Sequence, residues 1–438
     1  MLPAIGRSIW SYRRGLLTIA SMGAGGVWLA RYVKDQLLHH SRKTAQERAV
    51  YSDIERRFEQ NQQDVALTIQ ALLSDLSDVV ASLADPDHWM VQLKHTVKST
   101  GQAGTGGDTT APSLLTPSTS QDHTPSSSSS PSSQDEQPTL VEKPKTKLEL
   151  WNAVKVESYV RPLASIYLLA LLSLLSHTQI NLLGRSFYVA SVGVPEDDRE
   201  QSVRMALAGS QRLSWEEERV FLTSLPSHLL HQGARQCVDW VRRAVEEVMN
   251  PISLRTPCGP REIREHIEAI RRHIEGECLK EDFFKRCTGW MIPGRDDSDE
   301  EERSLLEVAM GHPISTPSPS LRGILDETYD LLESPNAQQV LQQALERLFD
   351  LFDQQISVEL APSLPPKVVE INGGEEGAEG GASCEIQSLP RLASLLPRIS
   401  RTTHKVWDES TNRYIKELHG LPTLRAYSAI VYSSYSTE

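Results

Sequence analysis

The segment 147–194 constrains the fold of this chain more than any other. Its central part, LASIYLLALLSLLSHTQINLL at residues 163–183, is apolar on every side of a helix. Such a helix must be covered all round, either by lipid or by other helices. Only fourteen uncharged residues follow Arg161 before Ser176 and His177, whereas a membrane span needs about 20. The segment therefore predicts the central helix of a helical bundle rather than a membrane-spanning helix.

The start of this helix carries two apolar stripes instead of one. On a helical wheel one side holds Leu150, Ala153, Val156 and Val160, and the opposite side holds Leu148, Trp151 and Val154, with Lys147 and Lys155 beside them. Two stripes need two burial partners. The second partner is either another helix of the same chain or an amphipathic helix of another protein. A tryptophan flanked by lysine is typical of an interaction hot spot, which motivates the second interpretation.

The N-terminus predicts a membrane anchor. Residues 15–30 form a run of sixteen uncharged residues with basic residues on both sides, and its apolar members are Leu16, Leu17, Ile19, Val27, Trp28 and Leu29. A cleaved secretory signal and a mitochondrial presequence are the alternatives. The first lacks a following disulfide pattern, and the second should be less apolar, so an uncleaved single-pass anchor within residues 1–33 is favoured. Both flanks of the span are basic, so charge alone does not fix its orientation; the longer basic run lies after the span and favours a large domain in the cytosol.

Charge divides the chain unevenly. The net charge of −13 argues against nucleic acid as a partner. Residues 1–48, however, hold eight Lys and Arg against two acidic residues, which gives +6. These basic flanks of the anchor are candidates for contact with anionic lipid.

Helical periodicity dominates the remainder, so the expected fold is all-α. It is an elongated multi-helix bundle behind an N-terminal single-pass transmembrane helix. Residues 34–98 form the first long helix of the bundle, with Asp85-Pro86 as a break. The core positions expected in it are Ile54, Phe58, Val65, Ile69, Leu72, Leu76, Val79 and Leu83. Residues 99–146 form a Ser/Pro-rich disordered insert, and 359–386 form a flexible Gly/Glu-rich loop.

The bundle itself is expected to occupy 147–358 and 387–438. Gly184 is a candidate end or break of its central helix. Helices are expected at about 214–224, 226–249 and 260–279, and the middle one has a core stripe of Leu229, Leu230, Val238, Val241, Val245 and Val248. Ser334-Pro335 predicts an N-cap and a first-turn proline that divide a long helical segment.

Motifs for catalysis or metal binding find no support in the sequence. The five cysteines include no CxxC pair, and Cys278, Cys287 and His273 do not have the spacing of a zinc site. There is no Gly-rich phosphate loop, no GxSxG and no HExxH. We therefore expect no enzyme, no cofactor and no metal. The arginine pair before His273 is interpreted as a solvated helix face rather than a lipid contact.

Several segments resemble one known family in their order along the chain. The segment 147–189 contains KLELW, followed by an apolar run that ends QINLLG. Gln60-Asn61-Gln62 precedes Thr68 in the first long helix, and LDETYDLLESP occupies 325–335. Together these pieces resemble the peroxisomal biogenesis factor 3 family, and they cover most of the chain outside the insert.

This resemblance implies an anchor in the peroxisomal membrane and a helical domain in the cytosol. It also implies docking of the import receptor peroxisomal biogenesis factor 19 through that receptor's amphipathic N-terminal helix. The family's docking positions match Lys147 and Trp151. Val154 stands where the family has leucine, and Leu93 in VQLKH matches a further docking leucine. Without the resemblance, a generic membrane-tethered helical scaffold is the alternative.

Overall fold

The computed structural model describes residues 45–102, 146–192, 213–276, 280–293, 299–312, 317–360, 389–408 and 412–433. All regular elements in these ranges are helices, which confirms the all-α class. The predicted anchor, with Leu16, Leu17, Ile19, Val27, Trp28 and Leu29, lies outside the described residues. So do most of the predicted insert and of the Gly/Glu-rich loop.

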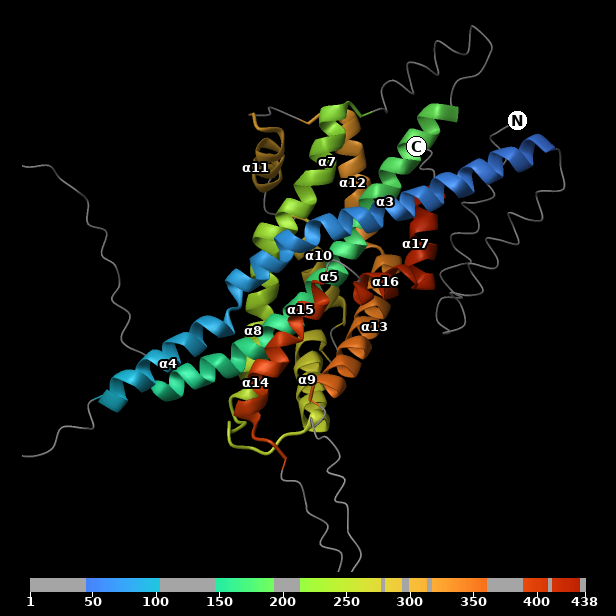
Figure 1. Ribbon diagram of the computed structural model, residues 1–438. Coiled ribbons are helices and arrows are strands. Elements are labelled where there is room, and N and C mark those ends of the chain that lie inside the picture. Colours follow the sequence, from blue (N-terminus) through green and yellow to red (C-terminus); the bar gives the residue numbers. More distant parts are fainter. Residues whose placement is uncertain are drawn as a thin grey trace, which may run out of the picture. The chain divides into compact units, whose positions relative to one another are not determined.

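The chain divides into two compact units, Met1–Asp85 with Lys155–Glu438, and Pro86–Val154. The larger unit contains the long helix α3 and most of α5 (Figure 1). The helices in chain order are α3 (Ala45–Leu83), α4 (Pro86–Gln102), α5 (Lys147–Val192), α7 (Trp215–His228), the π-helix η1 (Leu229–Gly233), α8 (Ala234–Met249), α9 (Pro260–Glu275), α10 (Lys280–Met291), α11 (Asp299–Met310), α12 (Pro319–Glu333), α13 (Pro335–Leu360), α14 (Leu392–Arg401), α15 (Thr403–Val406), α16 (Arg413–His419) and α17 (Pro422–Ser433).

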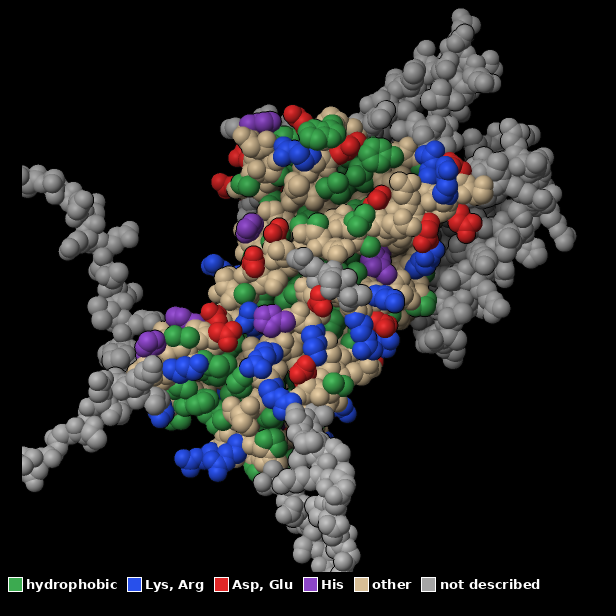
Figure 2. Space-filling view, viewed as in Figure 1, with side chains coloured by type: hydrophobic (Ala, Val, Ile, Leu, Met, Phe, Trp, Pro, Cys, Tyr) green, Lys and Arg blue, Asp and Glu red, His purple; other side chains and the backbone are tan. Residues whose placement is uncertain are grey.

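Helix α5 supplies the core of the larger unit. Within the described residues, two stretches, Ser52–His95 and Lys147–Tyr188, are long and apolar enough to cross a membrane by length and composition alone. The apolar window of the second is wholly buried inside the protein. That burial agrees with the predicted core helix. Gly184 does not end α5, which continues to Val192, so that prediction was wrong. Charged side chains of both signs lie on the face shown in Figure 2.

Helix α3 buries a face that overlaps the predicted one and is rotated from it by less than one residue. The buried apolar positions are Val65, Ile69, Leu73, Leu76 and Val80, whereas Leu72 and Val79 are only half-buried. Both sets have helical spacing. The residues at 72 and 73 are both apolar, and so are those at 79 and 80, so the sequence is compatible with either buried face. The predicted break is confirmed, because α3 ends at Leu83 and α4 begins at Pro86.

The helix that begins at Trp215 starts where the sequence predicts. Ser214 is its N-cap and forms a reciprocal capping box with Glu217. The predicted break near residue 225 does not occur. Instead Pro226 lies inside α7, and the chain continues through η1 into α8. In η1, Gly233 approaches Trp290 so closely that an added Cβ would lie 2.0 Å from the Trp290 carbonyl oxygen. Val248, predicted in the core stripe of α8, is only half-buried.

The later helix boundaries follow local signals. Ser334 separates α12 from α13, and its Oγ accepts a hydrogen bond from the amide of Ala337 at 3.3 Å. Gly276 ends α9 with φ of 72°, a conformation that favours glycine. Gly420 and Leu421 separate α16 from α17, which begins at Pro422.

Candidate partner-docking site

The smaller unit, Pro86–Val154, contains all four residues predicted to dock a partner. Within it, α4 lies beside the first turns of α5 (Figure 1). A capping box fixes the start of α5. The amide of Thr146 donates to Glu149 Oε2 at 2.8 Å, and the amide of Glu149 donates to Thr146 Oγ1 at 3.4 Å. The first helical residue is therefore Lys147, which sets the positions of Leu148 and Trp151.

The structure divides the four predicted residues by exposure. Lys147 is exposed and Trp151 is half-buried. Leu93 is 7% exposed and Val154 is 1% exposed. A partner helix can therefore touch Lys147 and Trp151 directly, whereas Leu93 and Val154 lie beneath the surface. Of the opposite stripe, Leu150, Val156 and Val160 are buried, as expected for the core side.

Two further apolar side chains of the same unit are exposed. Leu148 is 68% exposed, and Val91 on α4 is 50% exposed. The helical wheel already placed Leu148 beside Trp151. Val91 was missed, because only its exposure in the folded unit distinguishes it from the buried Leu93 two residues later. Exposed Lys94 and Lys147 add positive charge to this surface. We call Val91, Leu148 and Trp151 with these two lysines the docking surface.

Lys155 contradicts the sequence-based expectation. The wheel placed it beside Trp151 on the outer face, but it is 2% exposed and belongs to the larger unit. Its Nζ donates to the carbonyl oxygens of Met249 at 2.8 Å and Ile252 at 3.0 Å. These carbonyls lie at and just beyond the end of α8, where they have no partner within the helix. Burial lowers the pKa of Lys155.

Glu157, on the same helix, is held by Arg242 of α8. Arg242 Nε donates to Glu157 Oε1 at 2.9 Å, and its Nη2 donates to the carbonyl oxygen of Leu83 at 2.7 Å. Burial raises the pKa of Glu157, and the hydrogen bond and positive charge of Arg242 oppose that rise. One guanidinium thus connects α8, α5 and the end of α3.

The asparagine-containing stretch noted in the sequence joins α3 to α5. Asn181 Oδ1 accepts hydrogen bonds from Asn61 Nδ2 at 3.1 Å and from Gln62 Nε2 at 2.9 Å. Asn61 also donates to the carbonyl oxygen of Ile180 at 3.0 Å. Gly184 makes this approach possible, since a Cβ there would lie 2.6 Å from the Asn61 amide. The glycine is a close-packing site, which explains why it does not act as a helix end.

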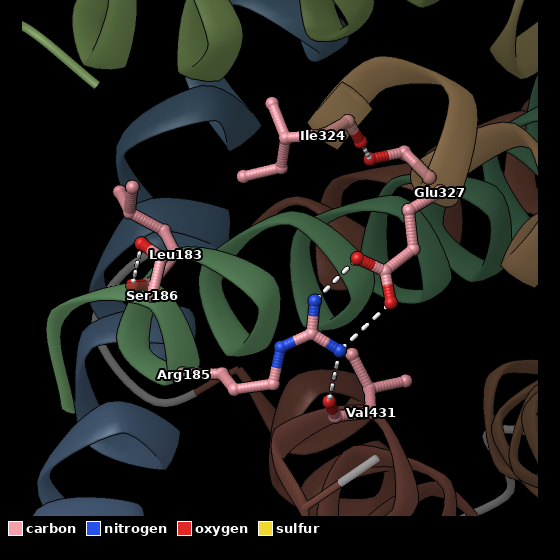
Figure 3. A network of polar contacts seen from close by, with 7 residues as sticks. Leu183, Arg185, Ser186, Ile324, Glu327 and Val431 are labelled. Atoms are coloured by element: carbon pink, nitrogen blue, oxygen red, sulfur yellow. Dashed lines mark hydrogen bonds and ion pairs between the residues drawn. The ribbon is translucent and has the colours of Figure 1, made fainter. Parts of the chain in front are cut away.

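The last turns of α5 contact α12 and α17 through one arginine. Arg185 Nη1 donates to Glu327 Oε1 at 2.7 Å, and its Nη2 forms an ion pair with Glu327 Oε2 (Figure 3). The carbonyl oxygen of Val431 lies 3.5 Å from the same guanidinium. Glu327 falls within the LDETYDLLESP segment, so two of the segments that carry the family resemblance meet here.

A buried histidine of α5, His177, lies against the half-buried His419 of α16. The Nδ1 of His177 lies 2.9 Å from the Oγ of Ser428, and its ring centroid is 5.2 Å from that of His419. Burial, assisted by the positive charge that His419 can acquire, lowers the pKa of His177 to about 3. Burial lowers the pKa of His419 as well.

The described residues do not form a reactive centre that we can identify. They include no group of three or more His, Cys, Asp and Glu side chains placed to hold a metal ion. Cys237, Cys258 and Cys287 are buried free thiols, and burial raises the pKa of each. A raised pKa keeps a thiol protonated and poorly nucleophilic. Cys278 lies outside the described residues.

These features define an all-α bundle protein built around one buried helix. A family model described as Peroxin-3 matches residues 7–434, nearly the whole chain. The chain therefore belongs to the Peroxin-3 family, and this membership supports a role in peroxisome membrane biogenesis.

Curated relatives agree with this assignment. Peroxisomal biogenesis factor 3 of Yarrowia lipolytica is 25% identical over 97% of this chain and 98% of its own length. Peroxisomal biogenesis factor 3 of Homo sapiens is 25% identical over 68% of this chain and 74% of its own. Peroxisome biogenesis protein 3-1 of Arabidopsis thaliana is 22% identical over 66% of this chain and 69% of its own length.

Proposed function

We propose that this chain is a docking receptor of the peroxisomal membrane for peroxisomal biogenesis factor 19, whose binding enables insertion of peroxisomal membrane proteins. The observation that carries the proposal is the docking surface, where Leu148 and Trp151 at the start of α5 and Val91 on α4 leave apolar area uncovered. In this proposal residues 1–33 anchor the chain, in a single pass with its bulk in the cytosol. No enzymatic step is part of it.

The chemistry of the surface suits an amphipathic helix. Leu148 and Trp151 lie three residues apart on one helix, so they form one edge of an apolar strip. Val91 belongs to the neighbouring helix of the same unit. A partner helix would place its apolar side on these residues and acidic side chains near Lys94 and Lys147. Leu93 and Val154, beneath the surface, would support Trp151 rather than contact the partner.

Titration with a peptide tests the proposal. The probe is a synthetic peptide of the partner's amphipathic N-terminal helix, titrated calorimetrically into the full chain in detergent. Trp151→Ala removes a central aromatic anchor, for which losses of about 2 kcal/mol or more, roughly thirtyfold in Kd, are usual. Trp215→Ala is the matched control, because Trp215 is 74% exposed but lies in the larger unit. Equal affinity of the Trp151→Ala variant and the parent would refute the site.

A second pair of variants tests the new members of the surface. Leu148→Glu should weaken the peptide complex, because it puts an acidic side chain where the partner is expected to be apolar or acidic. Leu67→Glu on α3 is the control, since Leu67 is similarly exposed at 64%. A generic membrane-tethered scaffold, the alternative function, predicts no peptide binding by any of these proteins.

A further inference from the structure

One surface of the larger unit is basic although the chain as a whole is acidic. Two segments, 250–261 and 389–407, contain no Asp or Glu, whereas the net charge of the chain is −13. Their side chains include a set of cations that we call the basic strip: Arg255, Arg391, Arg398, Arg401 and Lys405. Blue side chains gather over α14 and α15 in the space-filling view (Figure 2).

Backbone pairing brings the two segments together. The amide of Cys258 donates to the carbonyl oxygen of Pro390 at 2.9 Å, and the amide of Leu392 donates to that of Thr256 at 3.0 Å. An isolated antiparallel bridge pairs Pro257 with Arg391. Arg255 and Arg391, far apart in the sequence, are thereby neighbours, and both are exposed.

The helix that follows extends this charge along one side. Helix α14 buries its apolar side through Leu392, Leu395, Leu396 and Ile399. Arg398 and Arg401 lie on its other side, half-buried and exposed respectively, and Lys405 on α15 is exposed. The cations therefore lie on the outer side of α14 and α15, opposite the apolar side that packs into the core.

Little carboxylate neutralises the strip. Glu359 pairs with Lys405, and its pKa is lowered first by that hydrogen bond and further by the charges of Arg398 and Arg401. Among the described residues no carboxylate forms an ion pair with Arg255 or Arg391. Among the described residues, Glu359 is therefore the one carboxylate that forms an ion pair with a cation of the strip.

The hollow beside the strip does not offer a better anion site. It encloses about 590 Å³ and is lined in part by Arg264, Lys405 and Arg413. Arg264 lies 3.6 Å from Asp353, Lys405 pairs with Glu359, and Arg413 donates to Gln354. Its cations are already engaged, so the uncompensated charge is on the open surface rather than in the hollow.

We propose that the basic strip contacts the anionic phospholipid headgroups of the membrane that holds the chain. An open face with dispersed arginines suits a charged planar surface better than a peptide, which needs a groove. Leu389, 50% exposed beside Arg391, adds an apolar contact. A membrane of this kind repels acidic surface and attracts basic surface, so the strip gains by approaching it. The proposal rests on the membrane attachment in the proposed function.

Quenching of a fluorophore at the strip tests this contact. The full chain is reconstituted into phosphatidylcholine vesicles with or without 30% phosphatidylserine, which gives the membrane a strong surface potential. In both kinds of vesicle a fraction of the headgroups carries a nitroxide, which quenches a nearby fluorophore. The fluorophore is attached at exposed His404 as His404→Cys, with Cys278 and Cys384 replaced by serine. The variant Arg255→Glu/Arg391→Glu/Arg401→Glu removes the strip's charge. The control Arg235→Glu/Arg243→Glu/Lys285→Glu changes exposed cations elsewhere by the same net charge.

The expected result is quenching that increases several-fold with phosphatidylserine, disappears in high salt and in the strip variant, and persists in the control variant. Equal quenching in both vesicles would overturn the proposal. So would binding of soluble polyglutamate to the strip without lipid-dependent quenching, which would indicate an acidic protein partner. A chain that does not remain with phosphatidylcholine vesicles contradicts the anchor. An attached chain with unchanged peptide affinity but no quenching contradicts the strip alone.

Discussion

The buried His177 predicts that this protein loses stability in mild acid. In an unfolded chain the imidazole has its ordinary pKa of 6.5, whereas in the folded protein burial lowers the pKa to about 3. The unfolded state therefore binds a proton between these values and the folded state does not. Stability is retained above pH 6.5 and falls as the pH drops toward 3. Between pH 7.5 and pH 5 this one site should lower the free energy of unfolding by about 2 kcal/mol.

The variant His177→Asn isolates that contribution. The asparagine amide can occupy the position of the imidazole Nδ1, which lies 2.9 Å from Ser428 Oγ, but it does not titrate. Urea unfolding is followed by circular dichroism in detergent at pH 7.5 and at pH 5. For the parent and for the variant, it gives the difference in the free energy of unfolding between the two pH values. We expect the difference to be about 2 kcal/mol smaller in the variant than in the parent. His404→Asn, at an exposed histidine, is the control and should behave as the parent.

Asp353 also titrates in this range, but its contribution cancels in this comparison. Burial raises the pKa of Asp353 to about 6, so the folded state takes up a proton there first and acidification favours folding through that group. Asp353 is present in both proteins and lies on α13, apart from the substituted residue. An identical loss of stability in His177→Asn and the parent would refute the argument that proton binding at His177 opposes folding.

Two further predictions concern contacts of α5. Lys155→Met keeps most of the side-chain volume but removes the ammonium donor from the Ile252 carbonyl and from the Met249 carbonyl, which keeps only the Ile252 amide. Urea unfolding should therefore show a loss of about 1–3 kcal/mol, and retained stability would mean that water replaces the ammonium. Gly184→Ala puts a Cβ 2.6 Å from the Asn61 amide and should destabilise by about 1–3 kcal/mol. Gly323→Ala, at a helical glycine with open space around it, should not destabilise; equal effects of the two alanines would contradict the close-packing explanation.

The parts of the fold that could be predicted depend on local chemistry. The capping box of Ser214 and Glu217 and the break at Asp85-Pro86 are determined by residues within one turn of each other. The length of the apolar run at 162–175 was enough to identify a buried core helix. None of these signals depends on residues in a distant segment of the chain.

The parts that could not be predicted depend on partners far along the chain. Leu73 and Val80, rather than Leu72 and Val79, are buried because of the rotation that α3 adopts in the bundle, and the sequence of α3 permits both. Lys155 is buried because carbonyls at the end of α8, about ninety residues later, need a donor. At the docking surface, the wheel identified Trp151 and Leu148 but could not distinguish the exposed Val91 from the buried Leu93.

The polar residues of α5 have a role that its apolar residues cannot fill. A helix that is apolar on all sides gains almost equal burial in any rotation about its axis. Hydrogen bonds are directional, and those of α5 reach different helices: Gln179 donates to the carbonyl oxygen of Phe221 on α7, Trp407 donates to Ser165 at 3.1 Å, and Asn181 accepts from α3. Burying these groups costs desolvation that their hydrogen bonds roughly offset. Their main contribution is therefore to select one rotation of α5 from several of similar apolar burial.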